Sequence, residues 1–231
     1  MQVKNIDCGI SRRGLLLGFG ATGLTAMSTA CTSTTRERGP QLSYMPPSPE
    51  EYSQMYSAVS DDGYIIPAAP FERIGKQYLR QTVENPTGEG PGTVVVDTSR
   101  HFLYLVQKDG SALRYGVGLG RAGFEWSGRA VVQWKRKWPT WTPPAEMIAR
   151  DPKLAKYSAD NGGMKPGLDN PLGSRALYIF QDGVDTLYRL HGTPEWASIG
   201  KSVSSGCVRL LNQDVIDLYG RVPNRTPILV V

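Results

Sequence analysis

The sequence predicts a mainly β domain, a β-sandwich or partly open barrel of mixed sheets with one or two short helices. Three observations support this fold class. Short runs of β-branched and aromatic residues recur along the chain, Asp-Gly turns separate successive runs, and few stretches have a helical pattern.

The expected strands follow one another through the second half of the chain. Asp109-Gly110 and Asp182-Gly183 each lie between two apolar runs, which is typical of a β-hairpin. A helix is expected near residues 144–150, with an extension to 157, and a second over 213–219. Asn212 is a suitable N-cap for the second helix and Gly220 a suitable end. The strands are expected at residues 93–97, 101–106, 113–118, 130–134, 176–180, 186–190 and 228–231.

Residues 1–30 have the character of a secretory signal. Arg12 and Arg13 precede an apolar run from Leu15 to Ala30, shorter than the roughly 20 residues that cross a bilayer. The stretch around the two arginines resembles a twin-arginine (Tat) signal. We therefore expect export to the periplasm or cell envelope; an uncleaved N-terminal anchor is the alternative.

Cys31 follows the small residues Ser28-Thr29-Ala30, an arrangement that resembles the lipobox of bacterial lipoproteins, although Ser28 stands where Leu is usual. Cys31 is therefore a candidate lipidation site, and cleavage after Ala30 by an ordinary signal peptidase is the alternative. Contact with a membrane is expected only through the signal or this lipid anchor.

Composition disfavours several classes of function. The chain carries a formal charge of +5, of which residues 1–30 contribute +2, so the remaining 201 residues carry only +3. This small excess gives no reason to expect a nucleic-acid partner. Three cysteines and two histidines are too few for a disulfide scaffold, a four-cysteine zinc site or a His-rich metal site. No metal and no cofactor are expected.

The remaining chain divides at a glycine-rich break. Residues 31–88 begin rich in Ser, Thr, Pro and Tyr, which indicates a tether and an irregular N-terminal segment. The break at residues 88–92 precedes a folded domain over residues 89–231. Within this domain, the segment of residues 120–171 is long and irregular, and it contains four of the five tryptophans. Contact with substrate and packing in the core are the two alternative roles for these tryptophans.

The candidate chemistry lies between His191 and Arg209. Cys8 and Cys31 belong to the N-terminal segment, so Cys207 is the single thiol expected in the folded domain. A nearby imidazole makes a thiol nucleophilic by accepting its proton. Gly206 would let backbone N–H groups approach an oxyanion, and Arg209 is a cation suited to a carboxylate. These are the parts of a Cys-His acyltransferase or hydrolase; a buried, inert cysteine is the alternative.

The ordered motifs H-G-T (191–193), I-G-x-x-V-S-x-G-C-V-R-L (199–210) and N-x-D-V-x-x-L-Y (212–219) resemble the signature of the L,D-transpeptidase catalytic domain. This is the YkuD type, also called ErfK/YbiS/YcfS/YnhG. The resemblance covers roughly residues 93–231 and implies a β-sandwich of mixed sheets, in agreement with the strand pattern.

The resemblance implies a specific reaction on peptidoglycan stem peptides. Cys207 would attack the carbonyl before the terminal D-alanine of a tetrapeptide stem and form a thioacyl enzyme, which an acceptor amine would resolve into a 3→3 cross-link. His191 would be the general base and acid, oriented by a backbone carbonyl near Gly192 or Thr193. Ser205, Gly206 and Gly192 would contribute to the oxyanion hole or substrate contacts. Arg209 would bind substrate or hold the loop.

Two departures and several alternatives accompany this resemblance. The common T-P-x-G motif of the middle region is not obvious in this sequence. Many members have a second histidine two residues before the cysteine, and here that position is Ser205, so His191 would transfer protons alone. We also expect this pairing to make Cys207 react faster with alkylating agents near neutral pH than a free cysteine does. The alternatives are an envelope Cys-His peptidoglycan hydrolase or L,D-carboxypeptidase, an enzyme that attaches or detaches an envelope lipoprotein, and a non-catalytic wall-binding lipoprotein.

Overall fold

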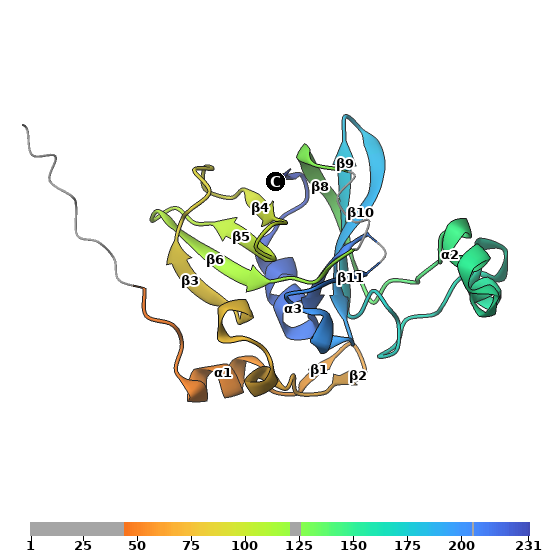
Figure 1. The fold of residues 1–231 in the computed structure, drawn as a ribbon, viewed down its shortest axis with the longest axis horizontal. Helices are drawn as coiled ribbons and strands as arrows, with labels where there is room; N and C mark the ends of the chain where they lie inside the picture. The colour runs from red at the N-terminus through yellow and green to blue at the C-terminus, as the bar shows by residue number, and fades with distance from the viewer. Residues whose placement is uncertain (1–43, 121–125, 205) are drawn as a thin grey trace, which may run out of the picture. The chain divides into compact units, whose positions relative to one another are not determined.

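The computed structural model describes residues 44–120, 126–204 and 206–231, so the expected signal, Cys31 and Ser205 lie outside the described residues. Its centre is a nine-stranded mixed sheet in the order β12-β10-β9-β8-β13-β4-β5-β6-β3 (Figure 1). The strands are β3 (Gln81–Glu84), β4 (Val94–Asp97), β5 (Phe102–Val106), β6 (Ser111–Gly116), β8 (Gly128–Lys137), β9 (Arg175–Gln181), β10 (Val184–Thr193), β12 (Val208–Leu211) and β13 (Thr226–Val230).

The remaining elements are short. Two small sheets pair β1 (Val59–Asp61) with β2 (Tyr64–Ile66) and β7 (Leu119–Gly120) with β11 (Ser202–Ser204). The helices are α1 (Pro49–Met55), α2 (Ala145–Arg150) and α3 (Asn212–Arg221), with 3-10 turns η1 (Phe71–Arg73), η2 (Lys76–Tyr78), η3 (Pro152–Tyr157), η4 (Ala159–Asn161) and η5 (Trp196–Ser198). Mainly β structure with mixed pairing and few short helices confirms the predicted fold class.

The large sheet bends so that its edge strand β12 also contacts the segment that follows β6. Strand β12 pairs in parallel with β10 on one side. On its other side, Arg209 exchanges two backbone hydrogen bonds of 2.8 and 2.9 Å with Gly118, which follows β6. A Cβ atom on Gly118 would lie 2.6 Å from the carbonyl oxygen of Ser198, so only glycine allows this approach. The edge strand that follows Cys207 is thus held from both sides.

One continuous hydrophobic core lies within this bend. In Figure 1, α3 lies between the half of the sheet that holds β4–β6 and the half that holds β8–β10. The α3 residues Val215 and Leu218 are fully buried in the same cluster as residues of both halves. Strand alternation therefore sends one row of side chains toward α3 and leaves the opposite face for other contacts. The core members from the strands include Val94, Val96, Leu103, Tyr115, Leu177, Ile179, Leu190, Val208, Leu210 and Ile228.

Helix α3 begins differently from the expectation. Asn212 is the first helical residue, not the N-cap, and Leu211 in the cap position has no side-chain cap bond. The Asn212 amide instead accepts the Ser174 N–H at 2.9 Å and donates to the Thr193 carbonyl at 3.2 Å. The helix also continues past Gly220 to Arg221. There Lys135 donates to the carbonyls of Tyr219 and Val222 and supplies the cation that a helix C-terminus favours.

Residues 44–88 contain ordered elements that contact the sheet. Strand β3 pairs antiparallel with β6. Tyr52 and Tyr56 of the α1 region are buried in a second cluster together with Ile199 and Leu211, which flank the Cys207 motif. No helix in the described part of the chain is long and apolar enough to cross a membrane.

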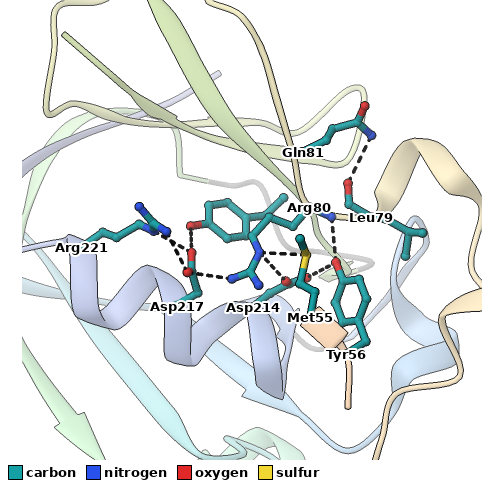
Figure 2. Close-up of polar contacts among 9 residues, drawn as sticks. Met55, Tyr56, Leu79, Arg80, Gln81, Asp214, Asp217 and Arg221 are labelled. Atoms are coloured by element: carbon teal, nitrogen blue, oxygen red, sulfur yellow. Dashed lines mark hydrogen bonds and ion pairs between the residues drawn. The ribbon is translucent and has the colours of Figure 1, made fainter. Parts of the chain in front are cut away.

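A buried polar network joins this N-terminal region to α3 (Figure 2). Arg80 lies between two carboxylates of α3, 3.7 Å from Asp214 and 2.9 Å from Asp217. The Tyr56 hydroxyl contacts Asp214 at 3.3 Å and accepts the Arg80 N–H at 2.7 Å. Asp217 also accepts from Tyr115 at 2.6 Å. Because removal of one member leaves a buried charge without its partner, this network fixes the N-terminal region against α3.

The four tryptophans of the irregular region have different surroundings. Trp138 is buried, stacks on Tyr64 with ring centroids 4.0 Å apart and donates to Asp61 at 2.8 Å, so its role is structural. Trp134 is half-buried on β8. Trp126 donates a hydrogen bond to Gln181 at 2.9 Å. The ring centroid of Trp141 lies 6.5 Å from that of Tyr157, the last residue of η3.

The buried state of Asp214 predicts a specific dependence of stability on pH. Desolvation raises its pKa to about 7, against the opposing attraction of Arg80. A carboxyl with a raised folded-state pKa contributes stability below its unfolded pKa of about 4, and that stability is lost as the pH rises toward 7. We expect the free energy of unfolding, measured by urea denaturation, to fall less between pH 5 and pH 8 in Asp214→Asn than in the wild type. The Asp160→Asn variant, at an exposed position, is the control. If the free energy of unfolding of Asp214→Asn fell as much as that of the wild type, the raised pKa of Asp214 would be contradicted.

Candidate active site

His191 and Cys207 are brought together by the β10–β12 ladder. His191 lies on β10 directly opposite Arg209 of β12, and Leu190 lies opposite Val208. Cys207 comes immediately before Val208, so it lies at the start of β12 beside Arg189 of β10. The thiol donates toward the carbonyl of Leu187 with a sulfur–oxygen distance of 3.9 Å.

The polar residues share the face of the sheet opposite α3. Leu190, Val208 and Leu210 point into the core, and alternation places His191, Cys207 and Arg209 on the other face. Burial has the largest effect on the pKa of both the His191 imidazole and the Cys207 thiol, and the charges of Arg189 and Arg209 act on both groups in the lowering direction. The predicted pair of site residues is therefore located in one neighbourhood.

A backbone carbonyl orients His191. Its Nδ1 lies 2.6 Å from the Gly192 carbonyl oxygen, which can only accept, so Nδ1 carries the proton. In the neutral ring, Nε2 is then the basic atom. The Gly192 carbonyl thus orients His191, and the expected contribution of Gly192 to an oxyanion hole or substrate contact stays a prediction. A Cβ atom on Gly192 would lie 2.3 Å from Asn212 Oδ1, so glycine is required where α3 approaches this strand.

Arg209 contacts a protein carboxylate. Its Nη1 lies 2.5 Å from Glu195, and the arginine side chain is only 17% exposed whereas that of Glu195 is 67% exposed. Of the two roles expected for Arg209, this contact supports holding the loop of residues 194–198. Gly206 has φ +133°, a backbone conformation that favours glycine, directly before the thiol.

An aromatic and cationic row extends across the sheet from the Cys207 end of β12. Trp134, Tyr178 and Arg189 are consecutive cross-strand neighbours on β8, β9 and β10. The Trp134 and Tyr178 rings stack with centroids 3.6 Å apart, and the Arg189 guanidinium lies 4.5 Å from the Tyr178 ring centroid. The guanidinium of exposed Arg136 lies 5.7 Å from the Trp134 ring centroid. Sequence reasoning did not identify this row, because cross-strand registration is absent from a linear pattern.

A strained bulge in β10 lies beside the thiol. The β9–β10 pairing is irregular between Asp185 and Arg189, and Leu187 has a left-handed φ of +63°. Such a conformation costs a residue with a Cβ roughly 1–2 kcal/mol. Asp185 accepts the Leu187 N–H at 2.8 Å and binds the Arg189 guanidinium with two contacts of 2.7 Å.

The described residues contain no group of three or more His, Cys, Asp or Glu side chains suited to a metal ion. The basic run Lys135-Arg136-Lys137 also does not form one cationic surface. Lys135 turns to the end of α3, Arg136 stacks on Trp134, and Lys137 lies 3.5 Å from Asp62.

Burial determines the resting protonation of the pair. Desolvation lowers the pKa of His191 to about 4 and outweighs the contact with Gly192 that favours the charged ring. Desolvation raises the pKa of the Cys207 thiol despite the nearby arginines. At neutral pH both groups are therefore uncharged in the resting site. This is the opposite of the expectation that Cys207 alkylates faster than a free cysteine near neutrality.

This resting state predicts a pH profile for alkylation. Because the thiolate forms only above the ordinary cysteine range near 8.5, iodoacetamide should modify Cys207 more slowly at pH 7 than it modifies a free cysteine. The rate should rise as the pH increases beyond that range. Mass spectrometry of the peptide containing Cys207 measures the rate, with a cysteine-containing model peptide as the control. A fast plateau below pH 7 that is lost in His191→Ala would instead indicate a preformed thiolate–imidazolium pair.

Comparison with known proteins gives the context for this geometry. The profile of the YkuD family, described as the L,D-transpeptidase catalytic domain, matches residues 91–230. The probable L,D-transpeptidase ErfK/SrfK of Escherichia coli K12 is 34% identical over 146 residues, which are 60% of this chain and 43% of that protein. The putative L,D-transpeptidase YkuD of Bacillus subtilis is 54% identical over 43 residues, 19% of this chain and 26% of that protein. The chain thus matches less than half the length of these relatives.

Solved structures give further similarities. A Brucella melitensis protein described as a probable carnitine operon oxidoreductase is 46% identical with a TM-score of 0.47, over 65% of this chain and 91% of that one. L,D-transpeptidase 3 of Mycobacterium tuberculosis is 20% identical with a TM-score of 0.43, over 62% of each chain. With the profile match spanning residues 91–230, the chain belongs to the YkuD family of L,D-transpeptidase catalytic domains.

Proposed function

We propose that this protein is a peptidoglycan L,D-transpeptidase that forms 3→3 cross-links through a thioacyl enzyme on Cys207. The observation that carries the proposal is the pairing of β10 with β12, which brings an oriented, neutral His191 to the same sheet face as the one cysteine of the described residues. Family membership supports the reaction class.

The first half-reaction acylates the thiol. The Cys207 Sγ attacks the carbonyl between the third stem residue and terminal D-alanine while its proton passes to His191 Nε2. The carbon–sulfur bond forms, and backbone N–H groups around Gly206 and Cys207 stabilise the oxyanion. The carbon–nitrogen bond then breaks, and the His191 proton goes to the departing D-alanine amine.

The second half-reaction transfers the acyl group. An acceptor amine, such as the side-chain amine of a diaminopimelate in another stem, attacks the thioester and gives its proton to His191. A new amide bond forms, the carbon–sulfur bond breaks, and His191 returns the proton to the thiolate. With water as acceptor, the same site would act as an L,D-carboxypeptidase or hydrolase, and with an envelope protein it would attach or detach a lipoprotein.

The reaction is tested by incubation of the purified protein with tetrapeptide-stem muropeptides and mass spectrometry of the products. We expect 3→3 dimers and free D-alanine from the wild type. Cys207→Ser should give no detectable dimer, and His191→Ala should react about 10²–10⁴-fold more slowly because it lacks the proton acceptor.

Each other outcome has a defined meaning. Dimer formation by Cys207→Ser at the wild-type rate would contradict the nucleophile assignment. Tripeptide products without dimers would favour the hydrolase or carboxypeptidase, and equal inertness of folded wild type and both variants would favour a non-catalytic wall-binding protein. Circular dichroism of each variant controls for folding.

We further propose that the protein acts in the periplasm or cell envelope, because residues 1–30 have a Tat-like signal pattern and Cys31 follows a lipobox-like stretch. The full-length protein expressed in a Gram-negative host should fractionate with the envelope. Arg12→Lys combined with Arg13→Lys should retain it in the cytoplasm. Cys31→Ser should abolish incorporation of radiolabelled palmitate but leave export intact if Cys31 is lipidated. Cytoplasmic wild-type protein would contradict the proposal.

A further inference from the structure

The sulfur of Cys207 lies against the backbone of β10. The Leu187 carbonyl lies 3.9 Å from Sγ, and the Arg189 backbone N–H forms a hydrogen bond to the cysteine side chain. Both backbone groups belong to the stretch in which the β9–β10 register shifts. The position of the nucleophile therefore depends on how this bulge is held.

Asp185 and Arg189 hold the bulge across its two ends. Asp185 Oδ1 accepts the Leu187 N–H at 2.8 Å, and the two Asp185 oxygens each accept from an Arg189 guanidinium nitrogen at 2.7 Å. Arg189 also donates to the Tyr188 carbonyl at 2.8 Å. The side chains of the pair thus contact the backbone of Leu187 and Tyr188, two residues that lie between Asp185 and Arg189 in the chain.

Side-chain packing does not hold Leu187 in place. Its side chain is 76% exposed, although its backbone has the left-handed φ of +63° that a residue with a Cβ rarely adopts. An apolar side chain in solvent gains nothing from this conformation. The hydrogen bond from its N–H to Asp185 is the described contact that favours it.

We propose that Asp185 and Arg189 form a positioning pair that fixes the β10 bulge and thereby sets the place of the Cys207 sulfur for acyl transfer. The inference rests on the proposed role of Cys207 as the nucleophile. Neither side chain is assigned contact with the reacting atoms. Without the pair, the left-handed Leu187 relaxes, its carbonyl and the Arg189 N–H move, and a small displacement of sulfur from the attack geometry lowers the rate steeply.

Neutralisation of Asp185 is expected to change the reactivity of Cys207 in two opposite ways, through the pKa of the thiol and through the position of the sulfur. The Asp185 carboxylate raises the pKa of the Cys207 thiol, so its neutralisation alone makes the thiol more acidic and faster to alkylate. Loss of position slows the attack on an acyl donor, which demands a defined geometry, whereas a small alkylating agent approaches from solvent with little such demand. The ratio of acylation to alkylation therefore separates the two effects.

The experiment compares Asp185→Asn, Arg189→Lys and the double variant in the full-length protein. Asn keeps an acceptor for Leu187 but loses the ion pair, and Lys keeps the charge but loses the two-contact geometry. Single-turnover acylation of Cys207 by a tetrapeptide donor is followed by intact-mass analysis, and iodoacetamide alkylation is measured alongside.

We expect the saturating acylation rate to fall about 10–100-fold in each single variant, with less than about a twofold change in half-saturating donor concentration. Alkylation of Asp185→Asn should be as fast as that of the wild type or faster. The double variant should be no slower than the slower single variant, because the two residues act as one unit. The matched control is Glu89→Gln, which breaks the two-contact Glu89–Arg129 pair elsewhere in the domain and should leave all rates unchanged.

Wild-type acylation rates in both single variants would overturn the proposal. Additive losses of the acylation rate in the double variant would also overturn it. So would an equal fall in the acylation and alkylation rates accompanied by a lower melting temperature, which is the result that a merely structural role would produce. A carbapenem serves as a second acyl donor. If the wild type does not react with the stem peptide, the proposed function fails, and the same comparison with the carbapenem still decides the positioning role. Failure of both donors to acylate Cys207 in the wild type would overturn both proposals.

Discussion

The candidate site depends on the parallel pairing of β10 with β12. This ladder sets His191 opposite Arg209 and brings Cys207, 16 residues further along the chain, to the same sheet face. Parallel neighbours need a crossover connection, and here residues 194–207 supply it. The loop is held by the Arg209–Glu195 ion pair and by the exchange of backbone hydrogen bonds between Arg209 and Gly118. Because β12 has only four residues, these links from outside the ladder add support to the cross-strand pairs with β10 that set its register.

Close packing of α3 then fixes the orientation of the histidine. Asn212 at the start of α3 binds the backbone of Ser174, just before β9, and of Thr193, the last residue of β10. Glycine at 192 leaves the space that this approach needs, and its carbonyl orients the imidazole. The buried network of Arg80, Asp214 and Asp217 secures the other side of the same helix to the N-terminal region. Residues that take no part in the proposed chemistry therefore determine where the imidazole points.

The site is built to react from a neutral state. Burial that keeps His191 unprotonated also keeps Cys207 a thiol at rest, so the proposed mechanism couples proton transfer to the attack. Such a resting thiol is less open to nonspecific alkylation or oxidation than a standing thiolate. The cost of this arrangement is that the sulfur must be placed accurately when substrate arrives. The proposed Asp185–Arg189 positioning pair would serve that purpose by holding the bulge beside the sulfur.

The sequence by itself determined the mainly β fold class, most strands and both hairpin turns. It also singled out His191 and Cys207, whose role as a catalytic pair stays a prediction. Apolar runs and Asp-Gly turns are local signals, and the cysteine and histidine could be singled out because so few of either are present. It did not reveal α1, β3 or β12, whose short patterns are stabilised by partners distant in the chain. Nor did it reveal the Trp134–Tyr178–Arg189 row, the Asp185 contacts or the partner of Arg209. Those features follow from strand register and burial, and only the tertiary structure decides which side chains become neighbours and which charges lose their water.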